Sequence, residues 1–380
     1  MSTGHDVIVV GLGAMGSAAS DHLAGRGLSV LGLDRFQPPH AVGSSHGESR
    51  IIREAYFEHP SYVPIVQRAY ECWTALERDT GRSLLRVTGG LMIGPEDGTL
   101  VQGALRSARE HGLPHERLGA SEARARFDAL AVREHEVAVW EPRAGILDPE
   151  ACVSAQLERA ARRGAELRFG EGVVSWRAEG GGVVVETARG RYRADRLVIA
   201  AGAWAPAIIG AGAPPLSIER QVLCWFEPLG EQVRLEPGRC PIWIWEHERG
   251  RYAYGFPLLP RGLKVARHHE GEPCTADAAR REVDSGEIAS MSELVHRLLP
   301  GAAGAVRETS TCLYTNTPDE DFVIDFHPHN PAVLVLSPCS GHGFKFASAI
   351  GEIAADLVTE GRSRFDLSRF RAGRFGSSVA

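Results

Sequence analysis

Three glycines and an acid near the start of the chain have the spacing of a dinucleotide-binding turn. Gly11, Gly13 and Gly16 form the pattern GxGxxG, directly after an apolar run at residues 6–10. In such a turn the first glycine makes the bend, the second lets the backbone approach a pyrophosphate, and the third lets the helix pack closely on the strand. Asp34 ends a second apolar run, where a carboxylate can accept hydrogen bonds from ribose hydroxyls. The pattern predicts a bound dinucleotide and leaves NAD and FAD open.

Lysine is rare in this chain, and its two occurrences are candidates for chemistry. Among 42 basic residues only Lys264 and Lys345 are lysine, and all the others are arginine. One interpretation is drift in an arginine-favouring genome. The other is that both positions need a compact ammonium, whose pKa shifts easily, rather than a planar guanidinium. The count fits both interpretations, so the surroundings of the two lysines have to decide between them.

The elements that must position these residues follow from the hydrophobic pattern. Residues 6–10 and 29–33 read as buried strands on either side of a small-residue helix, which makes a βαβ unit. Further helices are predicted at 61–77, 150–163 and after 343, with core strands near 167–169, 197–200 and 332–338. Residues 219–227 and 241–268 alternate and are rich in aromatic and branched residues, which favours a second, antiparallel sheet. We therefore predict an α/β fold, with a Rossmann-type domain built from several segments and a second domain of mostly antiparallel sheet.

Composition excludes several classes of protein. The chain has 380 residues, 43% hydrophobic and 24% charged, with a net charge of −6 and no long run of like charge. These values argue against a nucleic acid or an anionic membrane as partner. There is no apolar stretch of transmembrane length and no signal-peptide pattern at the N-terminus. The seven cysteines are scattered, with no CxxC or zinc spacing, so we expect no metal site and a reduced, cytoplasmic location.

A second motif bears on the choice of cofactor. Residues 194–204 read ADRLVIAAGAW, a buried strand that ends in a turn of small residues and tryptophan. Nothing in an NAD site requires such a turn. In FAD enzymes with an interrupted Rossmann domain, the turn brings the chain back to the flavin. The motif therefore favours FAD.

Five segments together resemble one family of FAD-dependent amine oxidases, that of monomeric sarcosine oxidase and N-methyltryptophan oxidase. The resemblance runs nearly end to end, and its last two motifs are specific to this group. The segments read DVIVVGLGAMG, PPHAVGSSHGESRIIREAY, RYAYGFPLLPRGLKVARHH, TCLYTNTPDEDFVIDFHP and SGHGFKFASAIGE.

The resemblance implies a role for each matching residue. One FAD per chain is expected to be covalently attached through a thioether to Cys312. Arg53 and Lys345 are expected to bind the substrate carboxylate, with Tyr254 and His268 beside the amine. Lys264 matches the lysine that holds a water near flavin N5 and serves oxygen, so both lysines fall where the family uses lysine chemically. The catalytic residues implied are Lys264, His268, Arg50 and Tyr254. The cofactor-binding residues implied are Gly11, Gly13, Gly16, Asp34, Ser44, His46, Arg50, Val173, Gly202, Cys312, Gly341, Gly343 and Lys345.

The resemblance also implies a domain division and a reaction. The FAD-binding domain is expected from residues 1–86, 147–215 and 319–366, and the catalytic domain from 87–146, 216–318 and 367–380. The expected reaction is oxidative demethylation of sarcosine, or a related N-methyl amino acid, to the amino acid, formaldehyde and hydrogen peroxide. The expected partners are a small secondary amino acid and oxygen, and the chain is expected to be a monomer.

Some features depart from the family pattern and leave alternatives open. Trp243 and Trp245 are expected near the pocket side of the second sheet, and Pro338 and Cys339 precede the glycine pair of SGHG. One residue is missing between Tyr254 and Lys264. These changes put the size of the substrate pocket in doubt, so a larger N-methyl or cyclic amino acid, such as N-methyltryptophan or pipecolate, is an alternative substrate. Alternatives from other classes are an NAD-dependent amino-acid dehydrogenase and a non-catalytic flavin-binding subunit.

Overall fold

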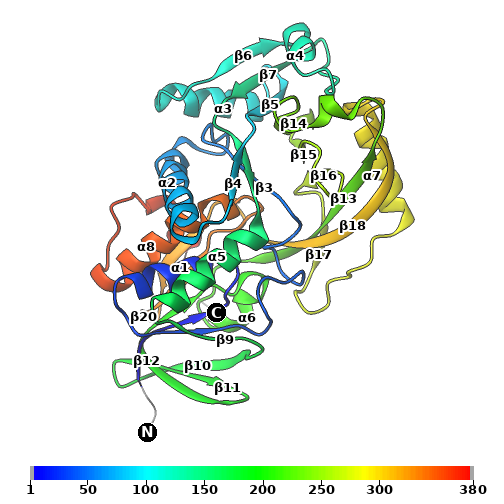
Figure 1. Ribbon diagram of the computed structural model, residues 1–380. Helices are drawn as coiled ribbons and strands as arrows, with labels where there is room; N and C mark the ends of the chain where they lie inside the picture. The colour runs from blue at the N-terminus through cyan, green and yellow to red at the C-terminus, as the bar shows by residue number, and fades with distance from the viewer. Residues whose placement is uncertain (1–3, 377–380) are drawn as a thin grey trace.

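The computed structural model describes residues 4–376 and contains two lobes, each built on one large sheet (Figure 1). The first sheet has eight strands. In order across the sheet they are β10 (Val173–Glu179), β11 (Gly182–Thr187), β12 (Gly190–Ile199), β1 (His5–Val10), β2 (Val30–Leu33) and β9 (Glu166–Arg168), with β20 (Asn330–Ser337) on the second half of β12 and β19 (Val323–His327) beyond it.

The centre of the first sheet is parallel, as the continuous apolar runs predict. β1 pairs in parallel with β12 and β2, and β12 with β20, while the hairpins β10–β11 and β19–β20 are antiparallel. Residues 7–10 and 30–33 are buried throughout, because helices cover one face, and a short helix at residues 205–209 with its neighbouring segments covers the other. The carboxyl ends of β1, β2, β12 and β20 therefore meet at one edge, where ligands bind in open α/β sheets.

Four helices lie on one side of the first sheet (Figure 1). They are α1 (Ala14–Gly25), α2 (Val63–Thr80), α5 (Pro149–Arg162) and α8 (Ala347–Glu360). Three of them lie against its strands, and the fourth, α2, lies against α5 and α8, which also pack against α1. One face of α2 is buried, and the indole N–H of Trp73 on that face donates to the carbonyl of Lys345 at 2.9 Å. The helix layer thus fixes the loop that carries one of the two lysines.

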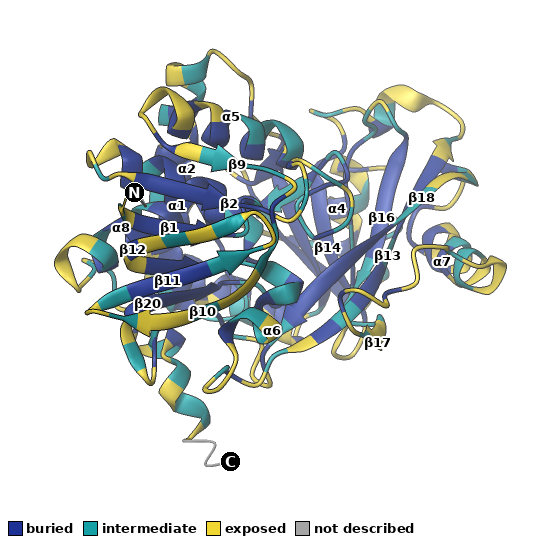
Figure 2. Cartoon of the chain, turned by 90° about the horizontal axis from the view of Figure 1, so that it is seen from below, coloured by how far each residue is buried: buried dark blue, intermediate teal, exposed yellow. Residues whose placement is uncertain are grey.

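The second sheet has nine strands, with one parallel pair, β14–β5, among antiparallel ones. In order they are β17 (Glu272–Cys274), β13 (Ser217–Pro228), β16 (Leu263–His268), β15 (Arg251–Gly255), β14 (Ile242–Glu248), β5 (Gly90–Pro95), β7 (Glu136–Glu141) and β6 (Glu116–Gly119), with β18 (Ala303–Asn316) on the other edge of β13. The sheet is mostly antiparallel, as predicted. Figure 2 shows β13, β14 and β16 largely in the colour of buried residues.

A small antiparallel sheet and shorter helices complete the chain. The sheet has the order β3 (Arg50–Ile52), β8 (Gly145–Leu147) and β4 (Leu85–Val87). The remaining helices are α3 (Thr99–Glu110), α4 (Ala120–Arg126), α6 (Ala205–Ile209) and α7 (Ser285–Leu298), with 3₁₀ turns at η1 (Pro60–Tyr62), η2 (Gly202–Trp204), η3 (Gln232–Leu235), η4 (Phe344–Phe346), η5 (Ser368–Phe370) and η6 (Ala372–Phe375).

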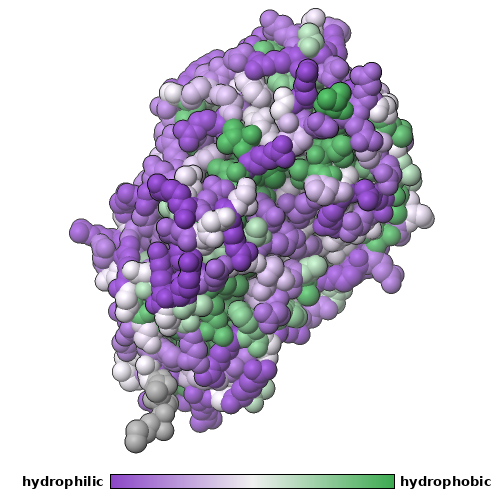
Figure 3. Space-filling model, in the orientation of Figure 1, coloured by the Kyte–Doolittle hydropathy of each residue, from purple (hydrophilic) through white to green (hydrophobic). Residues whose placement is uncertain are grey.

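The α/β fold class and the two-sheet architecture are confirmed. The assignment of segments to an FAD-binding and a catalytic domain stays a prediction, and residues 1–3 and 377–380 at its ends lie outside the described residues. Across residues 4–376, no helix is both long and apolar enough to cross a lipid bilayer. The face drawn in Figure 3 is mostly hydrophilic, with separate apolar patches.

Candidate active site

One large cavity receives residues from both lobes. The first sheet contributes the ends of β1, β2 and β20, and the second contributes side chains of β14, β15, β16 and β18. The loop at 34–45, the strand β3 and the turn before α8 close it. The cavity therefore lies where the carboxyl edge of the parallel sheet faces the antiparallel sheet.

The glycine turn lies at one end of this cavity. A Cβ on Gly11 would come within 2.6 Å of the carbonyl of Ala200, and a Cβ on Gly16 within 1.7 Å of the carbonyl of Gly11. Both glycines are therefore required by packing, and Gly16 does not itself line the cavity. Gly13 does line it, and a Cβ there would meet only the hydroxyl of Ser45 at 3.4 Å, so backbone is exposed to a ligand at this point.

Asp34 faces the cavity at the end of β2. Its two carboxylate oxygens accept hydrogen bonds from the amides of Leu12, at 2.6 Å, and Phe36, at 2.7 Å. Burial raises the pKa of this carboxyl above its ordinary value, although the two amides oppose the shift. Asp34 thus joins the glycine turn to the following loop, and its remaining lone pairs face the cavity where a ribose is expected.

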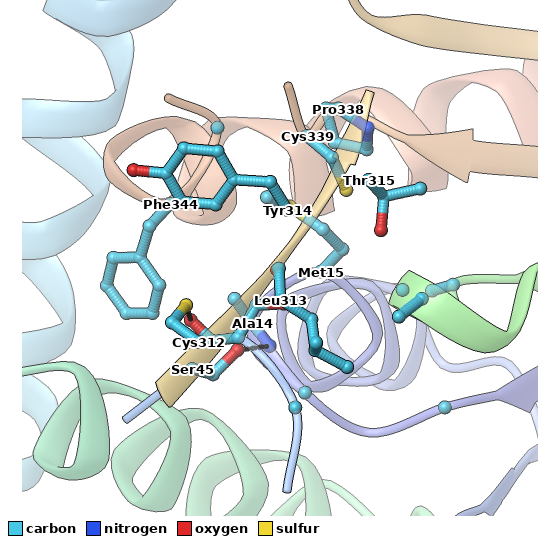
Figure 4. A pocket seen from close by; sticks show the side chains of 18 of the residues that line it. Ala14, Met15, Ser45, Cys312, Leu313, Tyr314, Thr315, Pro338, Cys339 and Phe344 are labelled. Carbon is cyan, nitrogen blue, oxygen red and sulfur yellow. Dashed lines mark hydrogen bonds between the residues drawn. The ribbon is translucent and has the colours of Figure 1, made fainter. Parts of the chain in front are cut away.

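Cys312 lies deeper in the cavity, on β18, among residues of the loop at 43–50. Its Sγ lies 3.9 Å from the carbonyl of Ser44 and 3.9 Å from a guanidinium nitrogen of Arg50. Arg50 also donates to the carbonyls of Ser44, at 2.7 Å, and Ser49, at 2.8 Å. Figure 4 shows Cys312 beside Ser45, with Phe344 on its other side. The sulfur therefore lies in the cavity lining with a guanidinium group as its neighbour.

Two buried cations, Arg53 and Lys345, line the same cavity. One nitrogen of Arg53 donates to both carboxylate oxygens of Glu58, at 2.7 and 2.9 Å, and another donates to the carbonyl of Ala55 at 3.0 Å. The third nitrogen, Nε, is buried and has no hydrogen-bond partner among the described residues. An unpartnered donor of this kind suits an anionic ligand.

Lys345 is held by the turn that precedes α8. Its Nζ donates to the carbonyl of His342 at 2.6 Å and lies 3.4 Å from the hydroxyl of Tyr56. Burial, and then the charge of Arg53, lowers the pKa of Lys345 to about 7, while Glu58 opposes the shift. Near neutral pH the ammonium is therefore close to its point of deprotonation.

Tyr254, His268 and Tyr314 form an aromatic group on the second sheet. Tyr254 and Ala266 are register partners on β15 and β16, and His268 Nδ1 lies 3.2 Å from the hydroxyl of Tyr314. Burial, reinforced by neighbouring His269 and His342, lowers the pKa of His268 well below its ordinary value. Burial raises the pKa of both tyrosines. All three groups are therefore neutral hydrogen-bonding side chains at physiological pH.

Lys264 and His46 are buried just outside the cavity lining. Lys264 Nζ donates to the carbonyls of Gly47, at 2.6 Å, and Ser49, at 2.9 Å. Burial, and then Arg50, lowers the pKa of Lys264 well below its ordinary value. Burial, followed by the charges of Arg50 and Lys264, lowers the pKa of His46 to about 3. Lys264 thus supports the loop that carries Arg50.

The structure brings most of the predicted residues together around one cavity. Those that line it are Gly11, Gly13, Asp34, Ser44, Arg50, Arg53, Val173, Gly202, Tyr254, His268, Cys312, Gly341, Gly343 and Lys345. Gly16, His46 and Lys264 lie outside the lining. The expected pocket-side position of Trp243 and Trp245 is wrong. Both indoles pack in the core on the far face of the sheet, and Ile244 between them lines the cavity.

Sequence reasoning missed several residues of the site. Glu58 pairs with Arg53, Glu141 holds the loop after Arg53, and Tyr56 contacts Lys345. The spacing of Glu58, five positions after Arg53, could have indicated that the two residues form an ion pair. Glu141 is distant in the sequence from the residues it holds and gave no signal.

The cavity fits a dinucleotide better than a small ligand alone. Its lining includes the Gly13 backbone and Asp34 as well as Gly202, Cys312 and Lys345. Two buried polar atoms have no partner among the described residues: Oγ1 of Thr315, which lines the cavity, and Nε2 of His46, just outside the lining. The donor set thus fits FAD, for which Gly13 and Asp34 would hold the pyrophosphate and ribose and Cys312 would face the ring.

Comparison with known proteins agrees with this geometry. Residues 6–357 match the model of a family described as FAD dependent oxidoreductase. The chain is 45% identical over the full length of both proteins to a monomeric sarcosine oxidase of Streptomyces avermitilis. It is 35% identical to an N-methyl-L-tryptophan oxidase of Yersinia pestis, over 98% of this chain and 99% of that protein.

A solved structure shows the same fold at lower identity. NikD, described as an unusual amino acid oxidase essential for nikkomycin biosynthesis, superposes with a TM-score of 0.85 at 26% identity, over 97% of this chain and 98% of that one. The chain therefore belongs to the FAD-dependent oxidoreductase family, in the group of monomeric sarcosine oxidase and N-methyltryptophan oxidase.

Proposed function

We propose that this protein is an FAD-dependent oxidase of N-methyl amino acids, with sarcosine as the leading substrate. Sarcosine, oxygen and water are converted to glycine, formaldehyde and hydrogen peroxide. The observation that carries the proposal is the presence of two buried cations, Arg53 and Lys345, in the same cavity as the glycine turn and Cys312. The relatives named above support the substrate class.

The two cations bind the carboxylate and thereby orient the rest of the substrate. Arg53 offers its unpartnered Nε and Lys345 its ammonium, and charge-assisted hydrogen bonds of this kind are strong and directional. Orientation of the N-methyl carbon toward the redox centre is worth roughly 7–11 kcal/mol of barrier in well-positioned reactions. FAD, when bound, supplies the two-electron acceptor.

The amine must lose its proton before electrons leave nitrogen. A substrate ammonium beside Arg53 and Lys345 has a lowered pKa, because like charges disfavour a further cation. His268, Tyr254 and Tyr314 are neutral and offer hydrogen bonds to the amine without adding charge. Water then hydrolyses the imine to glycine and formaldehyde, and oxygen accepts the electrons and leaves as hydrogen peroxide.

The attachment and accessory roles are part of the same proposal. We place one covalent FAD per chain on Cys312, and we place Lys264 in the reaction with oxygen. The chain acts as a monomer on a small secondary amino acid. The position of Cys312 supports the attachment, because its sulfur lies in the cavity lining next to Arg50.

A larger N-methyl amino acid is the second candidate. The inner face of β14 presents Ile244 to the cavity, and the bulky indoles of Trp243 and Trp245 point away from it. Phe57 also lines the cavity and stacks near Arg53, whose guanidinium carbon lies 4.8 Å from the ring centre. An apolar wall of this kind accepts a side chain on the α-carbon.

The test is a spectrum and a peroxide assay. The purified protein is expected to be yellow, and peroxide release is measured over sarcosine, N-methylalanine, N-methyltryptophan, pipecolate and proline. The proposal predicts turnover of at least one N-methyl amino acid. A colourless protein that takes up no FAD, or a yellow protein that oxidises none of these amines, would overturn it. An NAD-dependent dehydrogenase is disfavoured by the FAD family match.

A further inference from the structure

We propose that Glu141, at the end of β7, is the positioning residue of the carboxylate-binding site, acting through the loop at 53–58. The inference rests on the proposed function for the identity of the substrate. Glu141 does not line the cavity itself. It holds the backbone next to Arg53, and Tyr56 of the same loop contacts Lys345.

Glu141 grips the backbone directly after Arg53. Its two carboxylate oxygens accept the amide protons of Glu54, at 2.6 Å, and Ala55, at 2.9 Å. Glu141 is buried, with 1% of the residue's surface exposed, and no arginine or lysine pairs directly with its carboxylate among the described residues. A buried carboxylate that is satisfied mainly by two backbone amides is costly to keep, so it marks a position where the backbone must be fixed.

The backbone of Ala55 connects Glu141 to Arg53 through two hydrogen bonds. The amide of Ala55 donates to Glu141, and its carbonyl accepts from Nη1 of Arg53 at 3.0 Å. The same loop ends in Glu58, which accepts from the other terminal nitrogen of Arg53. Two of the three guanidinium nitrogens are thus placed by residues of a loop that Glu141 fixes, and the third, Nε, is left for a ligand.

The loop also reaches Lys345. Tyr56 follows Ala55, is fully buried, and places its hydroxyl 3.4 Å from Nζ of Lys345 and 2.6 Å from Nδ1 of His342. The Tyr56 ring also lies 4.2 Å from the guanidinium carbon of Arg53. A shift of the backbone at 54–55 would therefore displace both cations relative to the substrate carboxylate.

Protonation gives this arrangement a pH signature. Burial raises the pKa of Glu141 to about 7, against the opposing effects of the two amides and Arg53. Above this pH both carboxylate oxygens accept hydrogen bonds from the amides of Glu54 and Ala55. Below it one oxygen carries a proton and is a weaker acceptor. The charged or titratable groups that face Glu141 are Arg53, Glu54 and, on α2, Tyr70, with Arg143 acting on Glu54 and Tyr70.

The test measures the binding of methoxyacetate to the holoenzyme. Binding is monitored through the change in flavin absorbance. Methoxyacetate has the shape of sarcosine with an ether oxygen in place of the amine, so no turnover is needed. Glu141→Gln replaces one acceptor oxygen by an NH₂ group that faces an amide donor. At pH 8 we expect the Kd of methoxyacetate to rise about tenfold, the effect of one lost charge-assisted hydrogen bond at the lower end of its range.

Two controls separate positioning from general destabilisation. Glu136→Gln changes another buried acid on β7, which accepts hydrogen bonds from Arg133 and Trp245, and is expected to leave the Kd unchanged. The neutral ligand methoxyacetamide is expected to bind equally to Glu141→Gln and wild type. If Glu141→Gln weakens both ligands alike, or matches Glu136→Gln, then Glu141 has no specific role in carboxylate binding.

The pH dependence is the second readout. The ratio of Kd between Glu141→Gln and wild type is expected to fall from about ten at pH 8 toward one at pH 5.5, because the carboxylate of Glu141 in wild type becomes protonated over this range. The ratio cancels the titration of Lys345, which is common to both proteins. A ratio that does not change with pH would overturn the proposal.

A measurement on wild type keeps the proposal testable if Glu141→Gln does not fold. Amide hydrogen exchange of the peptide covering 53–56, corrected for the intrinsic rate, is expected to lose protection as the pH falls through about 7, and constant protection would contradict the inference. If wild type binds neither methoxyacetate nor sarcosine, the proposed function fails. If wild type binds them and Glu141→Gln behaves like wild type, only the positioning role fails.

Discussion

Arg53 and Glu58 form a buried ion pair in the lining of the cavity, with one guanidinium nitrogen 2.7 and 2.9 Å from the two carboxylate oxygens. Burial opposes the ionisation of Glu58, but Arg53, His342 and Lys345 together outweigh it, so the pKa of Glu58 lies below its ordinary value. Glu58 therefore stays negative and offsets one of the two cations. The proposed carboxylate site therefore carries a modest net charge rather than two free positive groups.

We predict that Arg53→Met and Lys345→Met each raise the KM for sarcosine by about one to two decades. Each removes one charge-assisted hydrogen bond to the carboxylate, worth roughly 1.5–3 kcal/mol. Steady-state peroxide assays measure the effect. Sarcosine amide is the control ligand, because it lacks the charge that the two cations recognise. If wild type oxidises sarcosine amide as well as sarcosine, the assignment of the two cations is wrong.

The lowered pKa of Lys345 predicts a specific dependence of ligand binding on pH. The ammonium has a pKa of about 7 in the free site, so its positive charge is present below pH 7 and is lost as the pH rises. The ratio of methoxyacetate Kd between Lys345→Met and wild type should thus be large at pH 6 and shrink toward pH 9. Titration of flavin absorbance at several pH values gives this ratio. A ratio that grows with pH would contradict the assignment.

Cys312→Ala should abolish covalent attachment of the flavin. In wild type, the yellow colour is expected in the pellet after acid precipitation, because a thioether survives denaturation. In Cys312→Ala the colour should appear in the supernatant, or the protein should bind little FAD. Cys339→Ala is the matched control, since Cys339 is the other cysteine that lines the cavity. It should behave like wild type. If only Cys339→Ala loses the covalently bound colour, the flavin is attached to Cys339 and not to Cys312.

Local sequence patterns predicted the elements better than the faces they present. The apolar run before Gly11 and the acid at Asp34 predicted β1, the glycine turn and β2, because these signals are local. The alternation in β14 correctly grouped Trp243 with Trp245 but did not tell which face meets the cavity. That choice depends on the packing of the whole sheet against α7 and its neighbours, which no local pattern carries.

The site itself was predicted mainly through residues that the resemblance names. Arg53, Lys345 and Cys312 come together from three distant segments, and their proximity follows from the fold rather than from their spacing. Glu141 and Tyr56 were missed for the same reason, because each acts through a backbone contact or a hydroxyl that becomes visible only when β7 and the turn before α8 meet the loop at 53–58.

The oxygen reaction gives the sharpest prediction, because the structure also offers a purely structural role for Lys264. The ammonium of Lys264 donates to the carbonyls of Gly47 and Ser49 and to the hydroxyl of Ser49. It lies 5.4 Å from the ring centre of Trp225 and is fully buried. If these contacts only support the loop, loss of Lys264 should weaken cofactor binding and substrate oxidation together.

We instead predict that Lys264→Met spares the anaerobic oxidation of substrate and slows the reaction of the reduced enzyme with oxygen by about two decades or more, the effect of removing one preorganised charge from a site of low dielectric. A nearby cation stabilises the anion that forms when oxygen accepts its first electron. Lys264→Arg should restore part of the rate, since it keeps the charge but not the compact shape.

Because the pKa of Lys264 is lowered well below its ordinary value, the oxygen step of wild type should slow as the pH rises and the cation is lost. Stopped-flow measurement of the two half-reactions separates the roles, and a variant that loses substrate oxidation while keeping the oxygen step would assign Lys264 to loop support alone.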